Sequence, residues 1–66
     1  MENTVGIRIR ERRIKLKMKQ EDLAKASNVS RATISALENG RCENVLVGTL
    51  LAIAKALNTS VEKFFA

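Results

Sequence analysis

The stretch KASNVSRATISALENG, residues 25–40, has a helical pattern that stops at Ser27-Asn28-Val29 and starts again at once. Asn28 belongs to the few residue types other than glycine that enter the left-handed backbone region at modest cost. Ser30 is a preferred helix N-cap, because its hydroxyl accepts a hydrogen bond from a backbone N–H of the first turn. The two short helices on either side are therefore expected to turn sharply instead of fusing into one.

The helix after this break has recognisable limits. It begins beyond Ser30 and is expected to end at Glu38, because Asn39-Gly40 supplies a C-terminal stop. Its buried side is marked by two apolar residues three positions apart, Ile34 and Leu37.

Two helices are predicted before the break. Val5, Ile9 and Leu16 share one face at helical spacing, which predicts an amphipathic helix over roughly residues 4–17. The other face of this helix is basic and carries Arg8, Arg10, Arg12, Lys15 and Lys17. A second, short helix is expected over residues 20–26, because acidic residues in its first turn complement the helix dipole.

Two further elements are predicted in the C-terminal third. Four apolar residues repeat at i, i+3, i+4 and i+7 and define a fourth helix, namely Leu50, Ile53, Ala54 and Leu57. Ser60 is the expected cap of a last helical turn or two through Phe65. At least one of Phe64 and Phe65 is expected to pack under the fourth helix. No stretch of useful length alternates as a strand does, so the predicted fold class is all-α.

Length and charge limit the function. The 66 residues suffice for one domain, 1–66, with a small core, at a size where folding alone is marginal. Twelve lysines and arginines against seven acidic residues leave a formal charge of +5. Such an excess on a small body favours an anionic partner, which means nucleic acid or an acidic surface.

Enzymatic and metal chemistry lack the residues that they need. Cys42 is the only cysteine and there is no histidine, which excludes an intrachain disulfide, a zinc site built on thiolates and a nucleophile–histidine pair. Cys42 is therefore expected to be an incidental loop residue, and no catalytic residue, metal site or cofactor is predicted. The N-terminus has no apolar h-region and no apolar run approaches the ~20 residues that span a bilayer, so a cytoplasmic protein without a membrane partner is expected. No small-molecule ligand is expected, because 66 residues leave no room for a ligand domain.

The break at Asn28 has the length of a particular DNA-binding motif. A sharp turn of a few residues between two short helices is typical of the helix-turn-helix, whose second helix enters the major groove. Ala24 fits this interpretation, because the two helices must pass close together and a larger side chain there would force them apart.

Two longer stretches resemble the Cro/C1-type (XRE-like) helix-turn-helix family of bacterial and phage transcription regulators. They are RIRERRIKLKMKQEDLAKASNVSRATISALENG and TLLAIAKALNTSVEKFF, and together they cover nearly the whole chain. The resemblance implies a compact five-helix bundle of the lambda-repressor-like type. The sequence departs from the family pattern at Asn28, where glycine is common, at Lys19, where serine or threonine is common, and in the loop RCENVLVG, which lacks the usual proline.

The resemblance also implies which residues touch DNA. The helix after the break resembles the recognition helix, and its positions expected to reach base edges are Arg31, Ala32, Thr33, Ser35 and Ala36. Arg31 is the one long donor among them, suited to a bidentate contact with guanine O6 and N7. The positions that match phosphate contacts of the family are Gln20, Asn39, Gly40 and Arg41, and Lys19 is expected to add another.

Two structural expectations complete the prediction. The family resemblance pairs Arg13 with Glu38 in a partly buried salt bridge, and the alternative is a surface arginine that contributes little. A homodimer is expected through the C-terminal part of the chain, because the apolar content of LLAIAKALNTSVEKFF exceeds the need of a small core. The residues expected to form this dimer interface are Leu51, Val61 and Phe65.

Two classes of function remain open. The first is a sequence-specific regulator that binds double-stranded DNA as a homodimer at a palindromic operator, a class that includes phage-type repressors and controllers of restriction-modification genes. The second is a protein-binding module of the antitoxin or anti-regulator kind on the same small helical fold. The basic face of the first helix fits either DNA contact or simple solvation.

Overall fold

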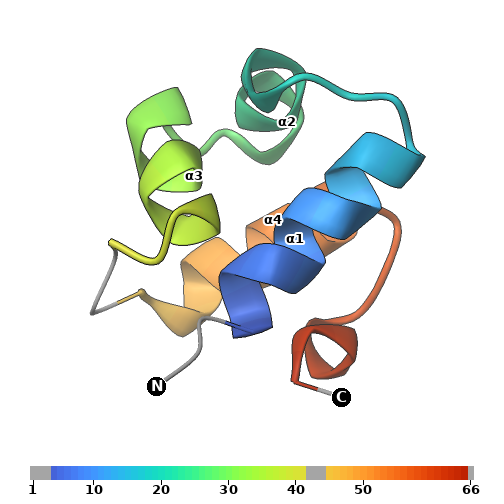
Figure 1. Cartoon of the computed structure of the whole chain (residues 1–66), viewed down its shortest axis with the longest axis vertical. Coiled ribbons are helices and arrows are strands. Elements are labelled where there is room, and N and C mark those ends of the chain that lie inside the picture. The colour runs from blue at the N-terminus through green and yellow to red at the C-terminus, as the bar shows by residue number, and fades with distance from the viewer. Residues whose placement is uncertain (1–3, 42–44, 66) are drawn as a thin grey trace.

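The computed structural model describes residues 4–41 and 45–65, and within them it shows only helices and connecting segments. The elements are α1 (Thr4–Lys15), α2 (Gln20–Ser27), α3 (Arg31–Glu38), α4 (Val47–Ala56) and the 3-10 turn η1 (Val61–Phe64) (Figure 1). The predicted all-α class is confirmed. Cys42 lies outside the described residues, so the expectation for it stays untested.

The expected five-helix bundle is wrong in its last element. The described part of the chain has four α-helices, and the segment after Ser60 forms a single 3-10 turn instead of a fifth. Its backbone bonds run from Lys63 N to Ser60 O (3.1 Å) and from Phe65 N to Glu62 O (3.1 Å). A segment this short forms too few i→i+4 bonds to offset the nucleation of an α-helix, whereas 3-10 bonds suit short pieces.

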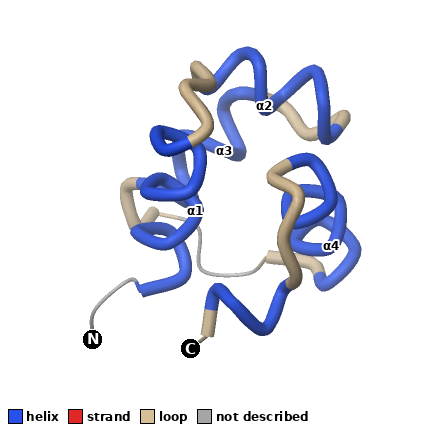
Figure 2. Tube along the Cα trace, turned by 90° about the vertical axis from the view of Figure 1, so that its right-hand side faces the viewer, coloured by secondary structure: helices blue, strands red, loops and turns tan. Residues whose placement is uncertain are grey.

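The helices enclose one apolar core. Seen from the side (Figure 2), α1 and α4 stand on opposite sides, with α2 at one end and η1 at the other. The buried apolar side chains are Ile9, Leu23, Ile34, Leu37, Leu50, Ile53, Ala54, Leu57 and Phe64. This set confirms the predicted buried faces of α3 and α4, and it shows that Phe64 is the phenylalanine that enters the core while Phe65 is 63% exposed.

All four α-helices end in the same hydrogen-bonding pattern. One residue just beyond each helix has a positive φ, namely Lys17, Asn28, Gly40 and Asn58. The next residue donates its N–H to the carbonyl five positions back, in the pairs Met18 to Arg13, Val29 to Ala24, Arg41 to Ala36 and Thr59 to Ala54. This is the Schellman ending, which satisfies carbonyls left over at a helix terminus. This ending reverses the direction of the chain directly after each helix.

The end of α1 differs from the prediction. The helix stops at Lys15, and Leu16, expected on its buried face, is 39% exposed. Lys17 adopts φ 58°, which reverses the chain and carries Met18 onto the core in place of Leu16. Nothing in the residue type announces this ending, since a lysine in the left-handed region pays the full steric cost of its Cβ.

The turn between α2 and α3 is the one expected from Asn28 and Ser30. Asn28 has φ 57° and ψ 31°, in the left-handed region. Ser30 is extended, and its hydroxyl accepts the N–H of Thr33 at 3.1 Å. The helix α2 runs one residue further than expected, through Ser27, whose buried hydroxyl donates to Leu23 O at 2.6 Å. Asparagine at the C-terminal end of α2 and serine at the start of α3 therefore produce the sharp turn.

This turn leads to a stability prediction. Asn28→Ala is expected to lower the free energy of unfolding by roughly 1–2 kcal/mol, because alanine pays the steric cost of the left-handed region. Asn28→Gly is the matched variant and is expected to change it by less than ~0.5 kcal/mol, since glycine adopts this conformation freely. Urea denaturation of both proteins measures the difference. Equal stabilities of the two variants would contradict the role given to Asn28.

Candidate nucleic-acid interface

The exposed N-terminal residues of α3 form the centre of the predicted DNA-reading surface. Arg31 and Ala32 are exposed, whereas Thr33, Ser35 and Ala36 are half-buried. Within residues 4–41 and 45–65, the structure records no hydrogen bond or ion pair of the Arg31 side chain. Its guanidinium donors are therefore available for a ligand.

Two hydroxyls on α3 are already engaged by the helix ends. The Thr33 hydroxyl lies 2.8 Å from the Ser30 hydroxyl, at the N-cap. At the other end, the Asn39 amide donates to Ser35 O at 2.8 Å and to Ser35 Oγ at 3.3 Å. Both contacts stabilise the termini of α3, so Arg31 is the side chain on this surface with the largest uncommitted donor capacity.

The N-terminus of α2 lies beside the start of α3. A groove of about 300 Å³ is lined by Arg13, Lys19, Gln20, Glu21 and Arg31. Three residues predicted for DNA contact, Lys19, Gln20 and Arg31, are thus brought to one place although they come from two helices. The positive end of a helix next to two cations favours an anionic group such as a phosphate.

The start of α2 is capped without the serine or threonine common in the family. The backbone N–H of Lys19 donates to Asp22 Oδ2 at 2.8 Å, which satisfies one of the free donors at the helix terminus. This contact leaves the Lys19 side chain, which is exposed, free to extend into solvent. The departure from the family pattern at Lys19 is therefore compatible with a well-formed α2.

Of the three residues after α3, Asn39 and Gly40 form the helix ending, and Arg41 has an exposed side chain. Asn39 binds its own helix through Ser35, and Gly40 has φ 72°, the left-handed conformation of the helix ending. Arg41 is exposed, and its backbone N–H donates to Ala36 O at 2.8 Å. Of the three predicted phosphate contacts in this segment, only Arg41 brings a long cationic side chain.

Arg13 and Glu38 form the ion pair that the family resemblance implies. Arg13 Nε lies 2.8 Å from Glu38 Oε2 and Nη2 lies 2.9 Å from Oε1, a bidentate geometry. The side chains are 13% and 2% exposed, respectively. Arg13 Nη1 also donates to Met18 O at 2.8 Å. The alternative, a surface arginine that contributes little, therefore does not apply to Arg13.

A third helix joins this pair. Gln20 Nε2 donates to Glu38 Oε1 at 3.2 Å, so the carboxylate links α1, α2 and the end of α3. The hydrogen bond with Glu38 is the main cause that raises the pKa of Arg13 above its ordinary value, while burial opposes it and the charge of Glu38 adds to it. The network fixes α2 and α3 relative to α1. The hydrogen bond from Gln20 to Glu38 was not predicted from the sequence.

The basic face of α1 is divided by the fold. Arg12 donates from Nε to Leu57 O at 3.0 Å and from Nη2 to Asn58 O at 3.2 Å, which ties α1 to the end of α4. Arg8 and Lys15 line a different groove of about 600 Å³ beside η1. Since α1 lies between α3 and η1 (Figure 1), this groove is on the far side of α1 from α3.

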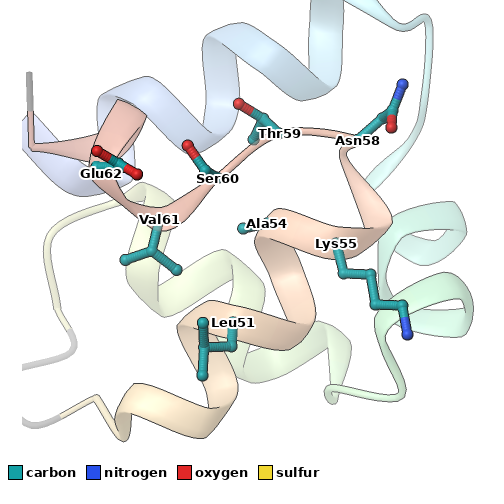
Figure 3. Close-up of a pocket in the computed structure, with 8 residues that line it drawn as sticks. All are labelled: Leu51, Ala54, Lys55, Asn58, Thr59, Ser60, Val61 and Glu62. Atoms are coloured by element: carbon teal, nitrogen blue, oxygen red, sulfur yellow. The ribbon is translucent and has the colours of Figure 1, made fainter.

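The three residues predicted for a dimer interface lie in the last third of the described chain, on α4, on η1 and just after η1. Leu51 is 55% and Phe65 63% exposed, two of the seven exposed large apolar side chains among the described residues, and Val61 is half-buried. Leu51 and Val61 line a groove of about 660 Å³ between α4 and η1 (Figure 3). Phe65 follows directly after η1 and is not part of the groove lining.

Within residues 4–41 and 45–65, no group of three or more His, Cys, Asp or Glu side chains is placed to hold a metal ion. Over the same residues, none of the helices has both the length and the apolar character needed to cross a membrane.

A short α2, a sharp turn and a capped α3 with an exposed arginine at its start define the class of helix-turn-helix DNA-binding proteins. The chain belongs to the helix-turn-helix family HTH_3, of the Cro/C1 type, whose pattern matches residues 9–64, and it is a DNA-binding transcription regulator.

Two solved structures show how closely the fold is shared. The restriction-modification controller protein C.AhdI from Aeromonas hydrophila superimposes with a TM-score of 0.89 at 32% identity, covering 94% of this chain and 92% of that chain. The restriction-modification controller protein C.Esp1396I gives a TM-score of 0.84 at 36% identity, covering 96% of this chain and 80% of that chain. Among curated protein sequences, none matches the chain significantly.

Proposed function

We propose that this protein is a sequence-specific regulator that binds a palindromic operator as a homodimer, with α3 of each copy in the major groove. The observation that carries the proposal is the groove shared by Lys19, Gln20 and Arg31. It places the expected base-reading donor, Arg31, beside the cation Lys19 and the N-terminus of α2, which suit a phosphate. The similarity to two restriction-modification controller proteins favours genes of a restriction-modification system as its targets.

The small size of the reading surface favours a dimer. The recognition helix has eight residues, and Arg31 is its one long donor. One copy therefore reads few base pairs, whereas two copies related by a two-fold axis read two half-sites about 34 Å apart, one turn of DNA. The exposed Leu51 and Phe65 supply apolar surface for such an association.

Two measurements test this proposal together. Selection from random duplex DNA is expected to enrich an inverted repeat with half-site centres about 10 base pairs apart. Sedimentation is expected to show a dimer at micromolar concentration. A monomer at tens of micromolar, both free and on DNA, would count against the homodimer, and enrichment of no sequence would move the protein-binding interpretation ahead.

A further inference from the structure

The groove between α4 and η1 has an apolar centre. Leu51 on α4 and Val61 on η1 face it from two sides (Figure 3), and the nearly buried Ala54 also lines it. Leu51 is 55% exposed. The groove volume of about 660 Å³ leaves room for side chains from another molecule.

The two ends of this groove carry opposite charges. Figure 3 shows Glu62 at one end and Lys55 at the other, with the apolar residues between them. Both side chains are exposed, and within the described part of the chain neither has a recorded ion pair or side-chain hydrogen bond. The groove therefore has a small apolar part at Leu51 and Val61, a polar edge formed by Asn58, Thr59 and Ser60, and one unpaired cation and one unpaired anion at its ends.

Such a surface is complementary to its own copy. A two-fold axis through the middle of the groove exchanges the two ends, so the anionic end of one molecule lies over the cationic end of the other, twice. The apolar centres meet on the axis. A partner with a single sign of charge would match one end and be repelled by the other, which favours a second copy of this chain over a purely acidic or purely basic partner.

We propose that a second copy occupies this groove in a register in which Lys55 of each copy pairs with Glu62 of the partner subunit. The inference rests on the homodimer of the proposed function and goes further, because it assigns the register and the two residues that select it. Opposite charges at an interface fix register and exclude wrong partners more than they add affinity. The pairs would orient the two copies and thereby set the separation of the two recognition helices.

Charge reversal tests this register. Lys55→Glu and Glu62→Lys each place two like-charge pairs across the axis, and each is expected to raise the dimer dissociation constant at least ~10-fold. The doubly reversed protein, Lys55→Glu with Glu62→Lys, restores opposite charges and is expected to return within ~3-fold of wild type. Sedimentation equilibrium over a concentration series measures all four proteins, and circular dichroism checks that each is folded.

Lys63→Glu is the matched control. It makes the same charge change as Lys55→Glu, and Lys63 lies on the same 3-10 turn as Glu62. However, Lys63 lines the groove beside α1 and not the groove between α4 and η1. It is expected to change the dissociation constant less than ~3-fold, since distant rim charges contribute little.

The possible outcomes separate the register from the function. A wild-type dimer that tolerates both single reversals, or a double reversal no tighter than the single ones, would overturn the register and leave the homodimeric regulator standing. A weakening by Lys63→Glu equal to that by Lys55→Glu would also overturn it, because net charge would then explain the effect. A wild-type monomer at tens of micromolar, both free and on DNA, would remove the register together with the homodimer on which it rests.

Discussion

Arg13→Ala is expected to lower the free energy of unfolding by about 3–5 kcal/mol, the cost of leaving a buried charge without its partner. The Glu38 side chain is 2% exposed and would retain only the hydrogen bond from Gln20 at 3.2 Å. The carbonyl of Met18 would lose its donor from Arg13 as well. The loss of these contacts also frees the end of α1 from the two helices of the motif.

A double-mutant cycle isolates the pair. Urea denaturation of Arg13→Ala, Glu38→Ala and the double variant is expected to show that the two single losses do not add, because each removes the same ion pair. Arg10→Ala is a suitable control, since Arg10 is an exposed arginine on the same helix, and it is expected to change stability by less than ~0.5 kcal/mol. Additive losses at Arg13 and Glu38 would show that the pair is not coupled in solution.

The pH dependence of this pair has a defined sign. The pKa of Arg13 is raised in the folded state, chiefly by its hydrogen bond with Glu38. A cation with a raised folded-state pKa contributes stability that is fully present below its unfolded pKa and is lost as the pH rises through the folded value. For an arginine this loss falls in strongly alkaline solution, so the contribution of Arg13 is constant across the neutral range.

The second large effect is expected at the DNA surface. Arg31→Ala is predicted to remove ~1–3 kcal/mol of binding free energy at the preferred site and to relax base choice at one position in each half-site. The nearby hydroxyls of Thr33 and Ser35 are engaged at the helix ends and cannot replace the lost guanidinium. Ala32 and Ala36 offer no polar side-chain atom.

Arg41→Ala provides the contrast for this prediction. Arg41 follows the left-handed Gly40, where the chain is expected to run beside the sugar-phosphate backbone. Its loss should weaken preferred and scrambled sites equally and lower the slope of log affinity against log salt by ~1 for each phosphate contact removed. Titrations of both variants on both duplexes, at several salt concentrations, separate base reading from phosphate binding.

Two other outcomes would contradict the role of Arg31 in base reading. If Arg31→Ala left both affinity and base preference unchanged, α3 would not read bases through its N-terminal turn. If Arg31→Ala and Arg41→Ala had the same sequence-independent effect, Arg31 would be a phosphate contact, and the specificity would have to lie elsewhere on the surface.

The sequence by itself determined the parts of this protein that depend on neighbouring residues. Asn28, Ser30 and Gly40 marked helix ends correctly, because caps and left-handed endings are built from hydrogen bonds within a few residues of chain. Helical periodicity identified the buried faces of α3 and α4, because the 3.6-residue repeat places apolar side chains three and four positions apart on one side of a helix. The family match over residues 9–64 then agreed with these local features.

Only the tertiary structure decided the features whose partners lie far along the chain. Arg12 binds the carbonyl of Leu57, 45 residues away, and no local pattern distinguishes it from the solvated arginines around it. The Gln20 amide, expected to be free for phosphate, donates to Glu38 because α2 and α3 bring them together. Lys17 takes a left-handed conformation that its side chain disfavours, since packing of Met18 on the core more than offsets the local steric cost.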